Sequence, residues 1–329
     1  MGASQTSNGK AFEFACLQAL FNALVGLQEV TIAQSAQFDS ARAYFLSLAD
    51  DKKYQLDQAA TAAARVIVRL EPLLKDSDNN TPLLLSLQGD AKGKVGDVRD
   101  VLCMRELTGW QIGLSCKHNN NAVKHSRLSS TIDFGKEWLG VPCSIDYFDA
   151  VTPIFEELDS LRKESSGTAA WSDIEDKGKR FYVPILSAFV AELQRLDSAC
   201  PNTIPTELFG YFLGRTDFYK VIAEDARRVT HVEGINLHGT LNSSSRVQKA
   251  IAKVKQLHLP TRFYHVGFKE KSQTTIDVAC DNGWQISMRL HNAKACIEPS
   301  LKFDIELVSL PKDVYKHDEP WGNTALLTL

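Results

Sequence analysis

The sequence predicts an α/β protein with a helical N-terminal region and a β-rich C-terminal third. The first 75 residues favour helices: residues 10–30 are apolar at nearly every position, and residues 40–75 are rich in Ala, Leu, Lys and Arg. Apolar residues alternate or run together in several segments after residue 260, as they do in β-strands. Between these regions, residues 95–117 contain two apolar runs separated by a turn-like stretch, a pattern that is typical of a hairpin.

The composition is that of a globular protein: 44% of the 329 residues are hydrophobic and 23% are charged. No apolar run reaches the roughly 18 residues of a membrane span, so we expect no membrane partner. The first ten residues lack the hydrophobic core of a signal peptide. An odd number of cysteines, seven, without a C-x-x-C pair argues against structural zinc and suggests a cytoplasmic location.

Element by element, helices are expected in "GKAFEFACLQALFNALVGLQEV" and in the segment that follows it, up to residue 75. Residues 122–130 are expected to begin a short helix. Residues 149–166 should form a helix with Pro153 in its first turn, and residues 179–200 another. Strands are predicted in "TRFYHVGF", "TTIDVAC", "GWQISMRL" and "LKFDIELVSL".

The hairpin brings an aspartate close to a lysine. In "WQIGLSCKH", Ser115 and Lys117 share one face of the second strand. If the turn centres near Leu107, Asp100 falls opposite Ser115 or Cys116 and close to Lys117. Such a pair is either an ordinary salt bridge or part of a site for metal-assisted cleavage of phosphodiester bonds.

One carboxylate is a poor magnesium site, because this ion prefers several oxygen ligands. Glu13 is the only charged residue between Lys10 and Glu29 and has strongly apolar neighbours. It is either an exposed residue that is favoured by the helix dipole or a second ligand that is aimed at Asp100. Asp97 is the alternative ligand, and Arg99 between the two aspartates is expected to pair with an acid or a phosphate.

An Asp, a hairpin, a lysine and an upstream helical Glu together resemble the PD-(D/E)xK nuclease core. The segments "GDVRDVL", "IGLSCKHNNNAVKHSRLS", "YFLGRTDFYKVI", "GTLN" and "GWQISMRLHNA…SLKFDIELVSLP" resemble the HaeIII-type restriction endonucleases, from about Gly9 to Pro311. The resemblance implies a mixed sheet flanked by helices. It also implies a type II enzyme that cuts both strands of DNA at a short palindrome, GGCC, with Mg²⁺. Cutting at a palindrome in turn calls for a two-fold symmetric homodimer. Ser115 departs from the pattern, which has Asp or Glu at this position, so the source of the second carboxylate stays open.

Six residues are candidates for DNA binding. Lys124, His125 and Arg127 follow directly on the strand with Lys117, where they would lie beside the scissile phosphate. Arg289 is the first candidate for reading a guanine, although its stem would equally cover an apolar sheet face. The remaining two candidates are Asn292, for base readout, and Arg215, which is alternatively part of an ion pair at a helix N-terminus.

The Pro-rich "CPNTIP" is a plausible boundary between two regions. We expect residues 1–200 to hold the helical N-terminus and the catalytic core, and residues 201–329 to form a β-rich DNA-recognition region. Two other functions remain open. One is a non-specific or repair-type nuclease, and the other is an inactive DNA-binding protein in which Ser115 marks a decayed site.

Overall fold

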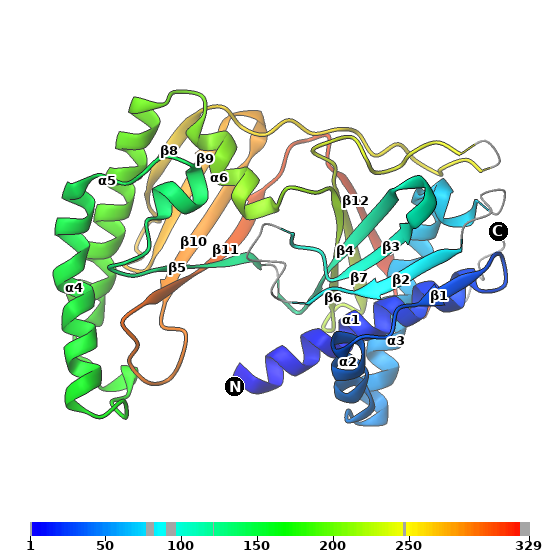
Figure 1. Ribbon diagram of the computed structural model, residues 1–329, viewed down its shortest axis with the longest axis horizontal. Coiled ribbons are helices and arrows are strands. Elements are labelled where there is room, and N and C mark those ends of the chain that lie inside the picture. The colour runs from blue at the N-terminus through cyan, green and yellow to red at the C-terminus, as the bar shows by residue number, and fades with distance from the viewer. Residues whose placement is uncertain (1, 77–81, 90–96, 121, 246–247, 323–329) are drawn as a thin grey trace. The chain divides into compact units, whose positions relative to one another are not determined.

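The computed structural model describes residues 2–76, 82–89, 97–120, 122–245 and 248–322 (Figure 1). The chain divides into two compact units. Unit 1 is built from Met1–Asn121, Thr216–Leu257 and Asp313–Leu329, and unit 2 from Ala122–Arg215 and His258–Lys312. These units do not follow the expected division at residue 200, because each of them recruits segments that are far apart in the sequence. None of the described helices has the length and apolar character that crossing a bilayer requires.

Unit 1 contains a mixed sheet. Strand β1 pairs in parallel with β2, and β4 with β6, while the other neighbouring strands are antiparallel. The α/β class is therefore confirmed, although β1 lies in a region that was expected to be wholly helical. The strands in spatial order are β1 (Val30–Ile32), β2 (Leu83–Leu87), β3 (Val101–Arg105), β4 (Trp110–His118), β6 (Phe218–Glu224), β7 (Val229–Ile235) and β12 (Tyr315–Pro320).

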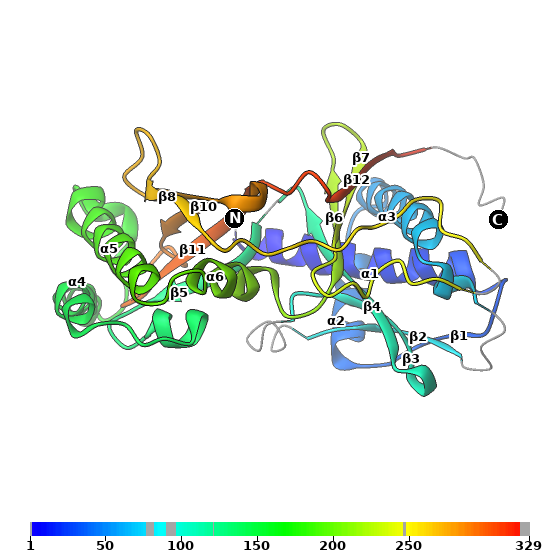
Figure 2. The same cartoon turned by 90° about the horizontal axis from the view of Figure 1, so that it is seen from above.

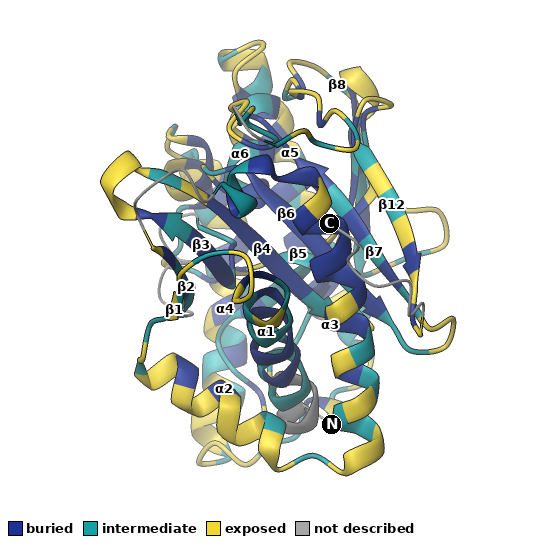
Figure 3. Cartoon of the chain, turned by 90° about the vertical axis from the view of Figure 1, so that its right-hand side faces the viewer, coloured by how far each residue is buried: buried dark blue, intermediate teal, exposed yellow. Residues whose placement is uncertain are grey.

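Three helices accompany this sheet: α1 (Gly2–Leu24), α2 (Ala36–Leu46) and α3 (Asp50–Leu70). Figure 3 shows α1 and α3 crossing the buried face of the strands. The small side chains of the alanine-rich stretch 59–64 in α3 are nearly all buried, which allows close packing against its neighbours. Apolar residues of both helices join those of the strands in one core, and burial of this surface is the main stabilising force.

Unit 2 contains an antiparallel sheet. Its strands in spatial order are β5 (Ala122–Leu128), β11 (Leu301–Ser309), β10 (Gln285–His291), β9 (Thr275–Cys280) and β8 (Phe263–Phe268). Helices α4 (Ile145–Glu164), α5 (Val183–Ala199) and α6 (Ile204–Leu213) gather beside one face of the sheet (Figure 2). On this face Phe303 packs against Trp138 and Phe189, with ring centroids 6.4 and 5.2 Å apart.

Two expectations for unit 2 were wrong. Residues 122–128 form strand β5 rather than the start of a helix, because their side chains alternate between the two sides of the sheet and the backbone pairs with β11. Pro153 lies inside α4 rather than in its first turn, because the helix already begins at Ile145, where Ser144 caps it by accepting a hydrogen bond from Tyr147 N–H. The four predicted strands after residue 260 are confirmed as β8, β9, β10 and β11.

A buried carboxyl group lies where α3 ends in unit 1. The Glu71 side chain is fully buried and accepts hydrogen bonds from the Tyr219 hydroxyl and the Asn242 backbone N–H, each 2.6 Å long. Burial raises the pKa of Glu71 to about 7, even though both hydrogen bonds lower it. Folding therefore favours the protonated form of this carboxyl group.

This raised pKa predicts how stability depends on pH. Folding raises the pKa of Glu71 from 4.5 to about 7. The stabilising contribution of the protonated Glu71 to the free energy of unfolding is therefore fully present below about pH 4.5 and is lost as the pH rises through 7. From about pH 5 to pH 8, we expect the unfolding free energy of the wild type to fall by roughly 2–3 kcal/mol more than that of Glu71→Gln. Urea titrations at both pH values measure this difference. Glu106→Gln, at an exposed turn position, is the control, and equal pH dependence in wild type and Glu71→Gln would contradict the prediction.

Candidate active site

The β3–β4 hairpin places Asp100 beside the end of β4, as expected. Val101 pairs with Leu114, and the Asp100 N–H donates to the Leu114 carbonyl over 2.7 Å. A short turn, Glu106–Thr108, joins the strands, and Gly109 follows it with a φ of 65°, a conformation that glycine adopts without strain. The register therefore puts Asp100 opposite Ser115.

Asp100 and Lys117 form a partly buried ion pair. Asp100 Oδ2 lies 3.6 Å from Lys117 Nζ and accepts a hydrogen bond of 2.6 Å from the Cys116 backbone N–H. Burial lowers the pKa of Lys117, but the neighbouring Asp100, Cys116 and Glu13 side chains, Asp100 most of all, raise it by more, so the net shift is upward. Lys117 is thus held as an ammonium ion beside two carboxylates.

Helix α1 brings Glu13 to this ammonium group. Three successive residues of β4 contact or interact with α1. The Cys116 thiol is hydrogen-bonded to the Cys16 thiol, and the charge of Glu13 raises the pKa of Lys117. The centroids of the His118 and Phe12 rings lie 6.2 Å apart. Glu13 itself is half-buried. Helix α1 contacts both strands of the hairpin, and it brings a second negative charge to Lys117.

Asp97 is engaged elsewhere. Its two oxygens accept hydrogen bonds from Arg99 Nε and Nη2 over 2.8 and 2.7 Å. Burial raises the pKa of Asp97, but the interactions with Arg99 lower it by a larger amount, so the pKa lies below its usual value. The Arg99 side chain crosses Gly113, where a Cβ atom would come within 2.2 Å of Arg99 Cδ, so this strand position requires glycine. The described residues contain no group of three His, Cys, Asp or Glu side chains suited to hold a metal ion.

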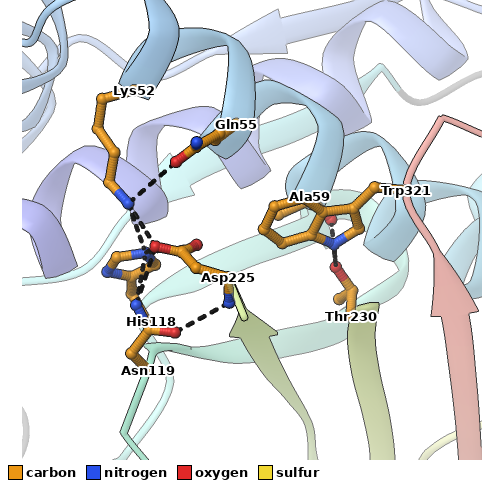
Figure 4. Close-up of polar contacts among 8 residues, drawn as sticks. All are labelled: Lys52, Gln55, Ala59, His118, Asn119, Asp225, Thr230 and Trp321. Carbon is orange, nitrogen blue, oxygen red and sulfur yellow. Dashed lines mark hydrogen bonds and ion pairs between the residues drawn. The ribbon is translucent and has the colours of Figure 1, made fainter. Parts of the chain in front are cut away.

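A polar network surrounds the end of β4 (Figure 4). His118 Nε2 lies 3.1 Å from both carboxylate oxygens of Asp225 and 3.2 Å from Lys52 Nζ, which itself lies 2.5 Å from Asp225 Oδ2. Asn119 adopts a left-handed backbone with φ of 49° and exchanges two hydrogen bonds with Asp225. Burial and the Lys52 ammonium group together lower the pKa of His118 by more than the Asp225 carboxylate raises it. Sequence reasoning missed Lys52 and Asp225, which have no local signal because they are distant in the chain.

Three of the predicted DNA-binding residues share the exposed face of the unit 2 sheet. His125 and Arg127 lie on β5, and Arg289 lies on β10. His125 Nδ1 and Arg289 Nη2 lie 2.7 and 2.9 Å from the Asp304 carboxylate. Arg127 Nη1 donates to the Ser300 hydroxyl over 2.9 Å.

The other three predicted residues are not part of this exposed face. Lys124 points to the opposite side of β5, where its Nζ lies 3.4 Å from the ring centre of Tyr211 and donates to the Tyr211 carbonyl. Burial, with a smaller effect of Arg215, lowers the pKa of Lys124 to about 8. Arg215 follows α6 and is exposed between less exposed neighbours, and Asn292 follows β10 and donates to the Lys294 carbonyl.

Comparisons with known proteins cover almost the whole chain. The family model described as HaeIII restriction endonuclease matches residues 9–311. The type II restriction enzyme HaeIII of Haemophilus aegyptius is 38% identical over 321 residues, which cover 98% of this chain and 99% of that enzyme. No solved structure matches the chain. Both units contribute to the matched range, and the chain therefore belongs to the HaeIII restriction endonuclease family.

Proposed function

We propose that this protein is a type II restriction endonuclease that hydrolyses double-stranded DNA at a short palindrome, GGCC, with magnesium as its cofactor. The observation that carries the proposal is the Lys117 ammonium group beside Asp100 and Glu13 in a chain that belongs to a family of restriction endonucleases. Magnesium and the GGCC palindrome rest on the chemistry of these side chains and on the sequence resemblance, respectively.

Asp100 and Glu13 are the residues that would hold the metal ion. Mg²⁺ is usually held by one or two carboxylates together with water and substrate phosphates, so these two side chains form a suitable donor set. Both described contacts of the Asp100 carboxylate use Oδ2, which leaves Oδ1 for a cation. The two carboxylates and the ammonium group carry a net charge of about −1. A bound divalent cation would change this to about +1, and the positive charge would attract a phosphate group of DNA. When bound, the ion would polarise the phosphate and lower the pKa of a water ligand.

Lys117 is the residue that we propose to act on the reacting groups. Its ammonium group would orient the attacking water or stabilise the charge that develops on the phosphate oxygens. Ser115, which precedes it by two residues, is buried and uncharged, so it adds no carboxylate to the site. Glu13 replaces the missing charge from α1, whereas Arg99 occupies the carboxylate of the alternative ligand, Asp97.

The exposed face of the unit 2 sheet is the surface that we propose to contact DNA. Arg289 is 60% exposed and is our first candidate for guanine readout, with Asn292 as the second. His125 and Arg127 would contact the backbone, whereas the contacts of Lys124 with Tyr211 do not support a phosphate role. A palindromic site would require a two-fold symmetric homodimer, with one subunit for each strand.

Incubating the purified protein with plasmid DNA, with and without magnesium, tests the proposal as a whole. We expect discrete fragments whose sequenced ends all lie at GGCC and which appear only with the metal ion. Cuts at another palindrome would overturn the GGCC assignment alone. Random ends would favour a repair-type nuclease, and binding without cleavage under any divalent cation would favour an inactive DNA-binding protein.

Lys117→Ala is expected to lower the cleavage rate by about a hundredfold or more, because a donor that stabilises transition-state charge is lost. Specific binding should remain, since this charge develops only during the reaction. Single-turnover cleavage and gel-shift titration measure the two quantities. Lys53→Ala, which removes a lysine that pairs with Asp50, is the control. A wild-type cleavage rate for Lys117→Ala would exclude this lysine from the site.

Glu13→Gln is expected to raise the magnesium concentration needed for half-maximal cleavage by about tenfold or more, because one of two ligand charges is lost. A titration of the cleavage rate with Mg²⁺ gives this value. Glu29→Gln, beyond the C-terminal end of α1, removes the same charge and should leave the titration unchanged. If Glu13→Gln behaves as the wild type, the glutamate has a structural role only.

A further inference from the structure

A carboxylate occupies the centre of the exposed sheet face in unit 2. Asp304 on β11 is paired across the strands with His125 on one side and with Arg289 on the other. Its Oδ1 lies 2.7 Å from His125 Nδ1, and its Oδ2 lies 2.9 Å from Arg289 Nη2. His291 Nε2 lies 3.1 Å from Oδ2. One side chain therefore holds three potential cations from β5 and β10.

The adjacent row of the sheet is basic. Lys302 pairs in register with Arg127 on β5 and with His291 on β10. Burial, together with Arg127, lowers the pKa of Lys302 more than Asp304 raises it. Five basic side chains thus lie in two adjacent rows around the carboxylate of Asp304, and Arg289 and His125 are 60% and 44% exposed. This is a face on which a phosphate-rich ligand would bind.

The carboxylate opposes binding to phosphate but orders the cations around it. Burial raises the pKa of Asp304, but its close contacts with His125, His291 and Arg289 lower it far below its usual value, so Asp304 carries a full negative charge at neutral pH. A negative charge in a basic face weakens attraction to any DNA, whatever its sequence. The same charge fixes the orientation of a flexible arginine before the ligand arrives, which reduces the entropy lost on binding. Base readout needs this fixed geometry, whereas attraction to the backbone does not.

We propose that Asp304 is a positioning residue that determines sequence specificity by holding Arg289, His125 and His291 in one arrangement on this face. The inference rests on the proposed function, because it needs a DNA palindrome that the protein recognises. It concerns Asp304, which the proposed function does not use. It predicts opposite effects of one substitution on specific and non-specific DNA binding, a pattern that a loss of folding or of overall charge would not give.

The test is Asp304→Asn, which keeps the shape of the side chain and removes its charge. We would measure Kd by fluorescence anisotropy, without a divalent cation, for a duplex of about 20 base pairs with the palindrome defined by the cleavage experiment and for a scrambled duplex. Non-specific binding should stay equal or become tighter. Specific binding should weaken. The specificity ratio, which is the Kd for the scrambled duplex divided by the Kd for the palindromic duplex, should therefore fall by about tenfold or more.

Glu306→Gln is the matched control. Glu306 lies two residues further along β11, is exposed, and pairs in register with Ser287 rather than with a basic residue. This substitution removes the same charge from the same strand, so it should tighten binding to both duplexes alike and leave the ratio of Kd values unchanged. A ratio that falls equally in both variants would show that charge alone is responsible and would overturn the proposal.

Two further variants separate positioning from a general effect on folding. If Asp304 acts through Arg289, then Asp304→Asn should lower the ratio less in an Arg289→Ala background than in the wild type, because coupled residues are not additive. Asp304→Glu keeps the charge but displaces it by one methylene group. It should retain the wild-type melting temperature and still lower the ratio, so the test remains decisive if Asp304→Asn folds poorly.

The outcomes distinguish this inference from the proposed function. Random cleavage or no cleavage in the plasmid experiment would contradict the proposed function, and the role of Asp304 in specificity with it. A wild-type protein that cleaves at a palindrome but binds both duplexes equally would contradict only the role of Asp304. A wild-type protein with a high ratio that both Asp304→Asn and Asp304→Glu retain would contradict only the role of Asp304. Full additivity of the Asp304→Asn and Arg289→Ala effects would also overturn it.

Discussion

The packing of α1 against the end of β4 is the contact on which the candidate site depends. A lysine at the end of a hairpin and one aspartate make an ordinary ion pair, and Ser115 adds no charge to it. The helix changes this because Phe12 contacts His118 and Cys16 contacts Cys116. Between these two contacts, the Glu13 carboxylate lies near enough to Lys117 to raise its pKa. Phe12, Cys16 and Cys116 are buried in the core, so the forces that stabilise the fold also set the electrostatics of the site.

Much of this arrangement was predictable because it follows from local periodicity. Alternation along β4 and the length of the turn determine the register, and the register puts Asp100 opposite Ser115. The isolated charge of Glu13 in an apolar helix was a second usable signal. Strand β5 was wrongly expected to be helical because three of its seven residues, Lys124, His125 and Arg127, have basic side chains that fit either structure. Only the pairing with β11 selects a strand.

Contacts between distant segments are the part that the sequence did not reveal. Lys52 and Asp225 meet beside His118, although 173 residues separate them, and no local pattern indicates such a meeting. The same holds for Asp304, whose neighbours on β5 and β10 are known only once the strand order is known. Predicted residues were therefore placed well where one hairpin sufficed. They were placed less well where a face depended on several strands, as Lys124 illustrates by pointing away from His125 and Arg127.

The chain passes between the two units four times, at residues 121/122, 215/216, 257/258 and 312/313. Neither unit corresponds to one continuous stretch of the gene, so no single exchange of a contiguous segment would transplant one whole unit into another protein. Unrelated proteins can gain a whole domain by a single exchange of continuous sequence, but a unit assembled from separate segments cannot be moved in this way. Change within either unit would therefore come from substitutions in place, while the strands keep their pairing.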